Sequence, residues 1–219
     1  MARDVGSPAQ GTRATLVKPS EALRAQFGDI DIYLFDQILK GRFDARSRVL
    51  DAGCGDGRNL VYFLRAGFTC YGVDADASAV AAVQRLASEL APDLPSDHFR
   101  QASLEQLPYP DASIDAVVCS AVLHFADDAA HFGRMVEELW RVLAPGGLFF
   151  ARLATNIGIE DRVPVANARV RLPDGSDRFV VDADTLLRWT DWLGARLADP
   201  IKTTNVQRLR CMTTWCMFK

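Results

Sequence analysis

The chain has 219 residues, of which 49% are hydrophobic and 24% are charged, and its formal net charge is −3. These values are typical of one globular domain that buries about 70% of its unfolded surface. The slightly acidic balance argues against nucleic acid as a partner, because binding a phosphate backbone requires a basic patch. No apolar run approaches the ~18 residues of a membrane-spanning helix, so we expect no membrane contact.

The first 19 residues are polar and lack the hydrophobic centre of a signal peptide. We therefore expect a flexible tail over 1–19, a single domain over 20–219, and a cytoplasmic protein. The five cysteines form no Cys-x-x-Cys pair, and their odd number favours a reducing compartment over a disulfide framework. The three histidines are not clustered as in a zinc site, so we expect no bound metal.

A helical pattern over residues 20–40 is interrupted at Gly28, which predicts two short helices. After it, short apolar runs alternate with amphipathic segments. We expect strands at 48–52, 68–73, 98–102, 114–120 and 146–153, with helices at 58–66, 76–90 and 127–143. This alternation predicts a parallel sheet with helices on both of its faces.

The alternation of strands and helices loosens after residue 154. Residues 168–181 have the pattern of two short strands joined by a Pro-Asp-Gly turn. A helix should begin after Asp182 or Asp184 and end near Trp192. In the C-terminal segment, apolar and polar residues alternate. This pattern predicts two further strands, joined around 205–207.

Three glycines occupy every second position in the stretch VLDAGCGDGRN (49–59), directly after the first predicted strand. Because glycine costs backbone entropy on folding, the cluster indicates a tight turn, a close approach of backbone to a ligand, or both. Ligands of open parallel sheets bind at the carboxyl ends of the strands, where this loop begins. A dinucleotide site has the spacing G-x-G-x-x-G, but Arg58 stands where the third glycine would fall. The spacing therefore disfavours a nicotinamide-dependent oxidoreductase, which we keep as an alternative.

The stretch DAGCGDG (51–57) resembles the first motif, D-x-G-x-G-x-G, of the class I (Rossmann-like) methyltransferases that use S-adenosylmethionine. Three further stretches are similar to motifs of that family, in the same order: YGVDAD (71–76), LPYPDASIDAVVCS (107–120) and ELWRVLAPGGLFF (138–150). The resemblance covers about residues 48–153. In motif style it is closest to the small-molecule and tellurite-resistance-type methyltransferases.

The resemblance implies a sandwich around a central seven-stranded, mostly parallel sheet whose last strand is antiparallel. It implies S-adenosylmethionine as cofactor and S-adenosylhomocysteine as product. The cofactor contacts that it implies around the first, second and fourth strands are Gly53, Cys54, Gly55, Gly57, Asn59, Asp74, Ala75 and Ser120. Asp74 occupies the acidic position that binds both ribose hydroxyls in the family, as a carboxylate with two acceptor oxygens can.

Two further residues near the glycines, Asp51 and Arg58, can each be interpreted in two ways. Asp51 either holds the glycine loop through backbone N–H groups or lies near the methionine end of the cofactor. Arg58 either pairs with the carboxylate of the cofactor or is a solvated arginine in the first turn of the next helix.

The chain departs from the family after the third predicted strand. Where many relatives carry an acidic residue that accepts from the adenine amino group, this chain has Ser103 followed by Leu104. Serine can accept that bond more weakly, and the backbone N–H of Leu104 can contact the ring. Alternatively, Glu105 takes the acidic role by a shift of register.

Methyl transfer from a sulfonium is an in-line displacement, so alignment and exclusion of water supply much of its rate. His124, which follows the fourth predicted strand, is either a general base for an oxygen acceptor or a structural histidine. We expect a small-molecule acceptor, since neither the Asn/Asp-Pro-Pro-Tyr motif nor the Pro-Cys pair of DNA-base methyltransferases is present. A non-catalytic protein that binds the cofactor remains an alternative, and we expect a monomer or a homodimer.

Acceptor specificity is expected in two segments beside the sheet. The N-terminal helices over 20–43 can form a lid, in which Tyr33 either contacts the cofactor or packs the lid on the core. The insert over 155–181 can form a flap. Its Arg169, Arg171 and Arg178 either meet an anionic acceptor or lie on a solvated hairpin face.

Overall fold

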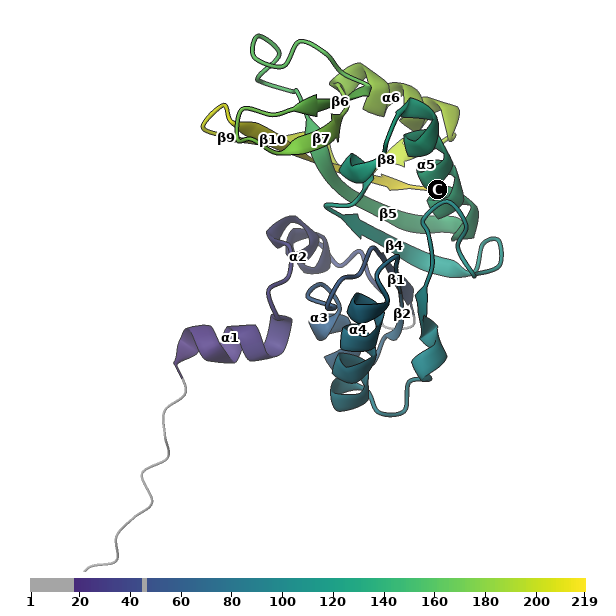
Figure 1. The fold of residues 1–219 in the computed structure, drawn as a ribbon. Helices are drawn as coiled ribbons and strands as arrows, with labels where there is room; N and C mark the ends of the chain where they lie inside the picture. Colours follow the sequence, from purple (N-terminus) through teal and green to yellow (C-terminus); the bar gives the residue numbers. More distant parts are fainter. Residues whose placement is uncertain (1–17, 45–46) are drawn as a thin grey trace, which may run out of the picture.

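The computed structural model describes residues 18–44 and 47–219 (Figure 1). The predicted tail over 1–19 therefore lies, apart from its last two residues, outside the described part of the chain. Eight strands of this part form the main sheet, namely β1 (Arg48–Ala52), β2 (Thr69–Asp74), β3 (Phe99–Gln101), β4 (Ile114–Ser120), β5 (Leu143–Thr155), β8 (Arg196–Leu197), β9 (Lys202–Val206) and β10 (Arg210–Phe218).

The strands follow the order β3-β2-β1-β4-β5-β10-β8, and β9 pairs with β10 along the edge that β8 also occupies. Neighbours from β3 to β5 are parallel, whereas β10 is antiparallel to β5. The predicted Rossmann-like sheet is therefore confirmed, with seven strand positions of which β8 and β9 share the last. β5 begins three residues before the predicted strand, because Leu143 pairs with Ile114 across an irregularity in the register.

Four helices cover the two faces of the sheet. One face carries α3 and α4 and the other carries α5 and α6 (Figure 1). Their bounds are α3 (Val61–Arg65), α4 (Ala77–Leu90), α5 (Ala129–Val142) and α6 (Ala183–Trp192), and the short 3-10 helices are η1 (Ser96–His98) and η2 (Leu123–Phe125). The side chains of Asp76, Asp128 and Asp182 cap three of them by accepting a first-turn backbone N–H. Of the two predicted caps for the last helix, Asp182 is the one that the structure contains.

Because both faces of the central strands are covered, neighbouring residues contribute in turn to two cores. Leu50 of β1 and Phe149 of β5 belong to the core under α5 and α6. Val49 and Phe150, one position away, belong to the core under α3 and α4. This double burial explains why these strands are continuously apolar.

The helix after the glycine loop is shorter than predicted. It begins at Val61 rather than Arg58, because the preceding residues form a turn in which Leu60 N donates to Gly57 O (2.8 Å). Arg58 and Asn59 therefore lie in the turn and not on the helix.

The N-terminal helices are α1 (Pro19–Phe27) and α2 (Ile32–Leu39), separated by Gly28 at a φ of +64° as predicted. α1 has no buried residue and contacts the domain through Phe27, whose ring stacks on Tyr62 at 5.5 Å. α2 buries Leu34 in the core under α3 and α4.

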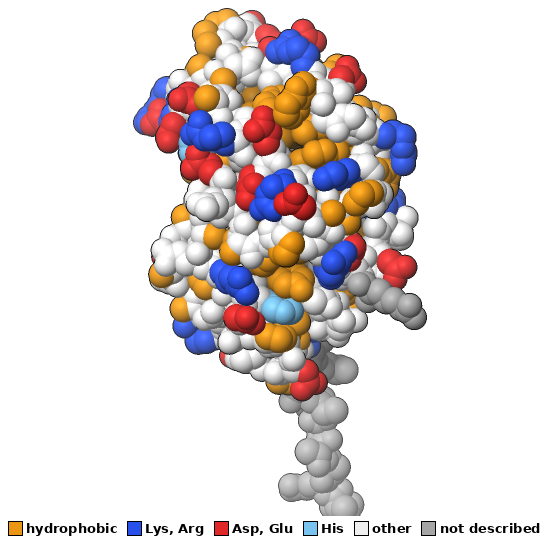
Figure 2. Space-filling model, turned by 90° about the vertical axis from the view of Figure 1, so that its right-hand side faces the viewer, with side chains coloured by type: hydrophobic (Ala, Val, Ile, Leu, Met, Phe, Trp, Pro, Cys, Tyr) orange, Lys and Arg blue, Asp and Glu red, His pale blue; other side chains and the backbone are white. Residues whose placement is uncertain are grey.

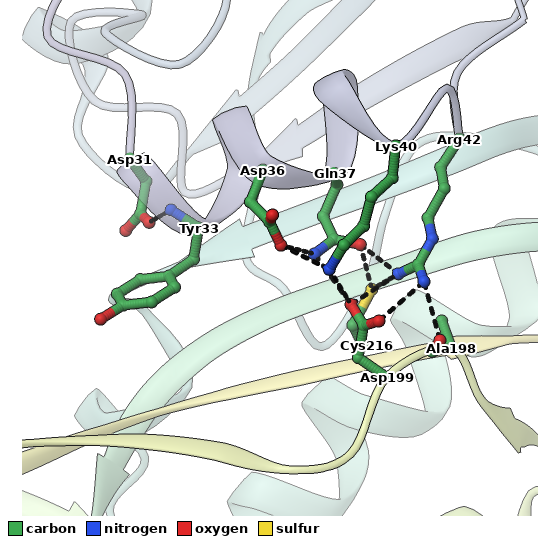
Figure 3. Close-up of polar contacts among 9 residues, drawn as sticks. All are labelled: Asp31, Tyr33, Asp36, Gln37, Lys40, Arg42, Ala198, Asp199 and Cys216. Atoms are coloured by element: carbon green, nitrogen blue, oxygen red, sulfur yellow. Dashed lines mark hydrogen bonds and ion pairs between the residues drawn. The ribbon is translucent and has the colours of Figure 1, made fainter.

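A polar cluster fixes the end of α2 to the segment between β8 and β9 (Figure 3). Asp199 accepts two bonds from the Arg42 guanidinium (2.7 and 2.8 Å). It also accepts from Lys40 Nζ (3.0 Å) and Gln37 Nε2 (3.1 Å). The Arg42 guanidinium holds the pKa of Asp199 well below its ordinary value.

The insert between β5 and α6 contains the predicted hairpin. Strands β6 (Ala168–Arg171) and β7 (Asp177–Val180) form a separate two-stranded sheet. Asp174 shapes its turn by accepting from the backbone N–H of Ser176 at 2.9 Å. A small third core, which includes Leu172 and Val180, packs the hairpin on β5 and β10.

The face drawn in Figure 2 shows no dominance of one charge. On the face drawn in Figure 2, basic and acidic side chains are interspersed among hydrophobic ones. Among the described residues, every helix falls short of the length and apolarity that a membrane crossing requires. In the same residues, no cluster of three His, Cys, Asp or Glu side chains could hold a metal ion.

Candidate functional site

The strand order reverses between β1 and β4, and the loops that leave these strands meet at the carboxyl edge of the sheet. The glycine loop (residues 53–57) leaves β1, and the segment 120–124 leaves β4. They are in close contact, because a Cβ atom on Gly53 would lie 2.4 Å from Val122 Cγ2. Both loops therefore line the place where open α/β sheets bind ligands.

The three glycines of the loop all have positive φ, but they do different things. A Cβ on Gly53 would collide with Val122, and one on Gly57 would collide with Leu86 of α4 at 2.7 Å. These two glycines permit close packing. Gly55, at a φ of +53°, has no atom within 4 Å of its Cβ position. Gly55 alone therefore presents bare backbone to open space, as a loop that lies against a ligand must.

Asp74 at the end of β2 organises this loop. Its Oδ2 accepts from Gly55 N at 2.9 Å and its Oδ1 accepts from Asp76 N at 3.0 Å. The next residue is also held, since Ala75 O accepts from Gln101 Nε2 at 2.9 Å. The predicted ribose-binding carboxylate is thus placed directly beside Gly55.

Asp51 at the end of β1 is a buried carboxylate, 1% exposed, and both of its oxygens lack a hydrogen-bond partner among the described residues. Burial raises its pKa to about 7, with Asp74 and Asp56 adding to the rise and Arg58 opposing it. The interpretation that Asp51 holds the glycine loop is wrong, because no described N–H reaches it and Asp74 performs that task. A buried carboxylate without a donor favours a cationic ligand.

A second polar group lies beside the first and centres on Asp31, the N-cap of α2. Asp31 Oδ2 accepts from Ser120 Oγ (3.0 Å) and from Arg152 Nη1 (3.1 Å). Its backbone N–H donates to Asn59 Oδ1 at 3.0 Å. Arg58 completes the group with bonds to Ser120 Oγ (3.3 Å) and to the backbone oxygen of Asp29 (3.2 Å). The predicted residues Arg58, Asn59 and Ser120 are therefore brought together, and they tie the N-terminal segment to the sheet edge.

Tyr33 of α2 directs its ring toward the C-terminal strands. Its hydroxyl shares a hydrogen bond with Thr204 of β9, and the Arg152 guanidinium lies 5.0 Å from its ring centroid. Lys202 Nζ lies 5.2 Å from the same centroid. These contacts fit the interpretation in which Tyr33 packs the N-terminal helices on the sheet.

Sequence reasoning missed Asp31 and Arg152. Arg152 is the only charged residue within the apolar stretch of β5. A charged side chain in a buried strand indicates a polar partner or a ligand. Asp31 carries no such signal, because aspartate before a helix is an ordinary cap.

The three residues considered for contact with adenine, Ser103, Leu104 and Glu105, lie in different surroundings in the structure. Glu105 accepts from Arg134 Nε at 2.8 Å, and this bond lowers the pKa of Glu105. Its side chain is thus committed to α5, which weakens the alternative in which it replaces the family's acidic residue. Ser103 is exposed and bonded to Glu105 Oε2 at 3.3 Å, and Leu104 is buried at 7% exposure. The roles of Ser103 and Leu104 stay predictions.

His124 of η2 is buried, with 5% exposure, and its Nδ1 has no partner among the described residues. Burial, together with the charges of Arg178, Arg152 and Arg210, lowers its pKa to about 4. The imidazole is therefore neutral at pH 7.

His124 borders a cavity of about 340 Å³ at the carboxyl ends of β4 and β5. The cavity is lined by Ala121, His124, Phe125, Arg152, Ala154, Leu172, Ser176, Arg178, Val206, Arg210 and Met212. Ala121 has a φ of +66°, which is uncommon for a residue with a side chain. This turn lets the segment 120–124 contact the glycine loop through Val122 and the cavity through His124.

The three arginines of the insert make different contacts. Arg178 borders the cavity. Arg171 is exposed and pairs with Asp177 at 2.7 Å, as on a solvated hairpin face. Arg169 donates to the backbone oxygens of Phe125 and Ala126 and so joins the hairpin to η2.

The five cysteines are free and buried. Burial raises the pKa of Cys54 in the glycine loop, whose sulfur packs near Gly72 of β2. A thiol with a raised pKa does not form the thiolate that nucleophilic chemistry needs. Cys54 therefore contributes packing and backbone to the loop.

The family model described as "Methyltransferase domain" matches residues 50–151, which include the glycine loop, Asp74 and the segment 120–124. Residues 50–151 of the chain thus match a methyltransferase domain, and the relatives and solved structures that the chain resembles include methyltransferases that use S-adenosylmethionine. It is 36% identical over 109 residues to a probable S-adenosylmethionine-dependent methyltransferase of Mycolicibacterium smegmatis, a match covering 50% of this chain and 38% of that protein. The chain spans about two fifths of the length of the curated relatives it matches.

Solved structures share the fold at low sequence identity. A methyltransferase from Methanosarcina mazei superposes with a TM-score of 0.63 at 18% identity, covering 83% of this chain and 96% of that one. Magnesium protoporphyrin IX methyltransferase from Synechocystis, solved with bound S-adenosylhomocysteine, gives a TM-score of 0.64 at 17% identity, covering 94% and 90%. The resemblance to the tellurite-resistance type stays a prediction.

Proposed function

We propose that this chain transfers the methyl group of S-adenosylmethionine to a small-molecule acceptor in the cytoplasm. The observation that carries the proposal is the arrangement at the carboxyl ends of β1 and β2. There the open backbone of Gly55 lies beside the carboxylate of Asp74, and Asp51, the last residue but one of β1, carries a buried carboxylate without a donor. The five free cysteines support the cytoplasmic location.

The charge of the site fits S-adenosylmethionine better than a nicotinamide dinucleotide. S-adenosylmethionine carries a sulfonium and an ammonium cation, and either one would stabilise the ionised form of Asp51. A pyrophosphate would instead meet the carboxylates of Asp51 and Asp74 and be repelled by both. Such repulsion disfavours the oxidoreductase alternative independently of the glycine spacing.

The chain's own residues would mainly bind and orient. Asp74 would accept from the ribose hydroxyls, and Asp51 would pair with a cationic group of the methionine moiety. Ser103 and the backbone of Leu104 would contact the adenine ring. When bound, S-adenosylmethionine supplies a methyl group already activated on sulfur, so a strong catalytic acid or base is not required.

His124 would act on the acceptor. Because it is neutral at pH 7 and lines the cavity, its imidazole can accept a hydrogen bond or a proton from an acceptor hydroxyl. Its low pKa makes it a weak base while the cavity holds no anion. The general-base role therefore depends on what else binds there.

The N-terminal helices would exclude water from the reacting groups. Asp31 joins α2 to β4 and β5, and Asp199 joins the other end of α2 to the C-terminal strands. A lid fixed at both ends keeps the edge of the sheet covered, which favours a reaction in which charge disappears.

Transfer of labelled methyl groups tests the proposal. The protein is incubated with methyl-labelled S-adenosylmethionine and a low-molecular-mass cell extract, and label is measured in small molecules and in protein. We expect label in the small-molecule fraction, and at least ~10-fold less with Asp74→Ala at a cofactor concentration below the dissociation constant of the wild type. Label in protein would contradict a small-molecule acceptor. Bound cofactor without any transfer would favour the non-catalytic alternative.

A further inference from the structure

We propose that the cavity beside His124 binds an anionic group of the methyl acceptor, a carboxylate or a phosphate, through Arg178. The inference rests on the proposed function, since it names the class of molecule that the site would methylate. The binding of an anion can nevertheless be measured without any methyl transfer.

The charged groups around the cavity include one more cation than carboxylates. Arg152 is paired with Asp31 at 3.1 Å, and Arg210 is paired with Asp174 at 3.6 Å. Arg178 forms no ion pair with a carboxylate among the described residues, although its charge, like that of Arg210, lowers the pKa of Asp174. It donates to the backbone oxygen of Asp177 at 2.7 Å, and its guanidinium lies 5.0 Å from the Phe125 ring centroid. Three guanidinium groups and two carboxylates therefore sum to one positive charge at the cavity wall.

A second, independent feature is the buried imidazole. His124 is 5% exposed, borders the same cavity and has an Nδ1 without a partner. Positive charge from Arg152, Arg178 and Arg210 converges on it, because each lowers its pKa. A buried polar atom without a partner is costly unless a ligand satisfies it. An anion bound by Arg178 would offset this positive field and bring the pKa of His124 back toward its ordinary value.

The other residues that line the cavity indicate the size and polarity of the rest of the ligand. Phe125, Leu172 and Met212 are apolar, and the volume of about 340 Å³ is at the lower end of small-molecule sites. The acceptor would thus combine an anionic end with a compact apolar body. Its reactive atom would face the segment 120–124, whose other side contacts the glycine loop through Val122.

Proton NMR of the histidine rings tests the anion site directly. The chain has three histidines, His98, His124 and His131, so their ring signals can be assigned by single substitutions. Inorganic phosphate and malonate are titrated separately, without cofactor, at constant ionic strength and pH. We expect at least one of them to shift the His124 signal saturably while the His98 and His131 signals stay in place. The anion that saturates at the lower concentration identifies phosphate or carboxylate as the preferred group.

Two variants make the titration specific. Arg178→Gln should weaken the binding of the anion at least ~10-fold. This is the loss of affinity expected when a hydrogen bond to a charged group is removed. Arg171→Gln, on the same hairpin but paired with Asp177 outside the cavity, should bind as the wild type does. No saturable shift of His124 with either anion would overturn the proposal. An undiminished shift in Arg178→Gln would also overturn it.

The same protein separates this inference from the proposed function. If phosphate or malonate shifts His124 but S-adenosylmethionine does not bind, the anion site stands and methyl transfer is refuted. If S-adenosylmethionine binds and neither anion shifts His124, methyl transfer stands and the anion site is refuted.

Discussion

The two halves of the sheet edge carry opposite charge. On the side of β1 and β2, the carboxylate of Asp74 holds the bare backbone of Gly55, and Asp51 carries a buried carboxylate without a donor. On the side of β5 and the hairpin, Arg152, Arg178 and Arg210 surround a neutral histidine. Between them runs the segment 120–124, with Val122 against the glycines and His124 in the cavity.

This contrast matches the chemistry of the proposed reaction. A cationic methyl donor belongs beside carboxylates, and an anionic acceptor belongs beside arginines. The opposite fields would also keep each ligand out of the site of the other. Substitutions on each side of the segment 120–124 should therefore have separable effects.

The largest expected effect is that of Gly55→Val. Its side chain fills the open space at the loop, so we expect S-adenosylmethionine binding to weaken by at least ~1,000-fold, which is about 4 kcal/mol. Gly67→Val is the matched control, because Gly67 also has positive φ (+78°) and nothing near its Cβ position. Calorimetric titration and urea unfolding of both variants are compared. Equal loss of stability with loss of binding in Gly55→Val alone supports the ligand site, and normal binding by Gly55→Val would refute it.

Asp51→Asn should stabilise the free protein at neutral pH. The native pKa of Asp51, about 7, lies above that of the unfolded chain, so ionisation favours unfolding. The cost is absent below about pH 4, grows as the pH rises to 7, and reaches at most about 4 kcal/mol. The difference in unfolding free energy between Asp51→Asn and wild type should therefore be only about 1 kcal/mol at pH 4.5 and several-fold larger at pH 8. Asp56→Asn, an exposed change in the same loop, should show no such difference, and a pH-independent effect of Asp51→Asn would contradict the account.

Asp74→Ala should weaken S-adenosylmethionine and S-adenosylhomocysteine alike, by about 1.5–3 kcal/mol. Both ligands share the ribose that Asp74 is proposed to hold. Gln101→Ala, which removes a bond to the adjacent Ala75 O, serves as the control and should leave both affinities unchanged. Wild-type affinity in Asp74→Ala would mean that the ribose assignment is wrong.

The smallest effect concerns the attachment of α2. Asp199→Asn should lower the unfolding free energy by about 2 kcal/mol at pH 7, since it weakens the bidentate bond to Arg42. The native pKa of Asp199 is lowered, so in the wild type this stabilisation is present above about pH 4 and is lost as the pH falls below it. Asp177→Asn, which removes an exposed ion pair, should change stability by less than about 1 kcal/mol. Equal effects of the two variants in urea titrations would contradict a special role for the α2 contact.

The glycine loop and Asp74 could be predicted because their information is local. Three glycines follow one strand, and the acidic residue ends the next, so spacing alone brings them to one edge. The parallel sheet was predictable for a similar reason, since strands such as β4 are apolar throughout their middle. The spacing could not predict that the buried carboxylate of Asp51 lacks a hydrogen-bond donor. Whether a carboxylate finds a donor depends on the folded surroundings.

The cavity could not be predicted, because its residues come from separate segments that only the fold brings together. Arg178 was considered with two neighbours on the hairpin, and the sequence could not tell which of the three faces inward. Arg210 lies in the C-terminal hairpin, where nothing sets it apart from an ordinary surface residue. Arg152 was the readable signal, a charge within an apolar strand.

The central claim is that the acidic half of the edge binds S-adenosylmethionine. Calorimetric titration of the full chain with S-adenosylmethionine, S-adenosylhomocysteine and NADH tests it most directly. We expect micromolar binding of the first two and no heat of binding with NADH. Binding of NADH, or no binding of either adenosyl ligand by folded protein, would contradict it.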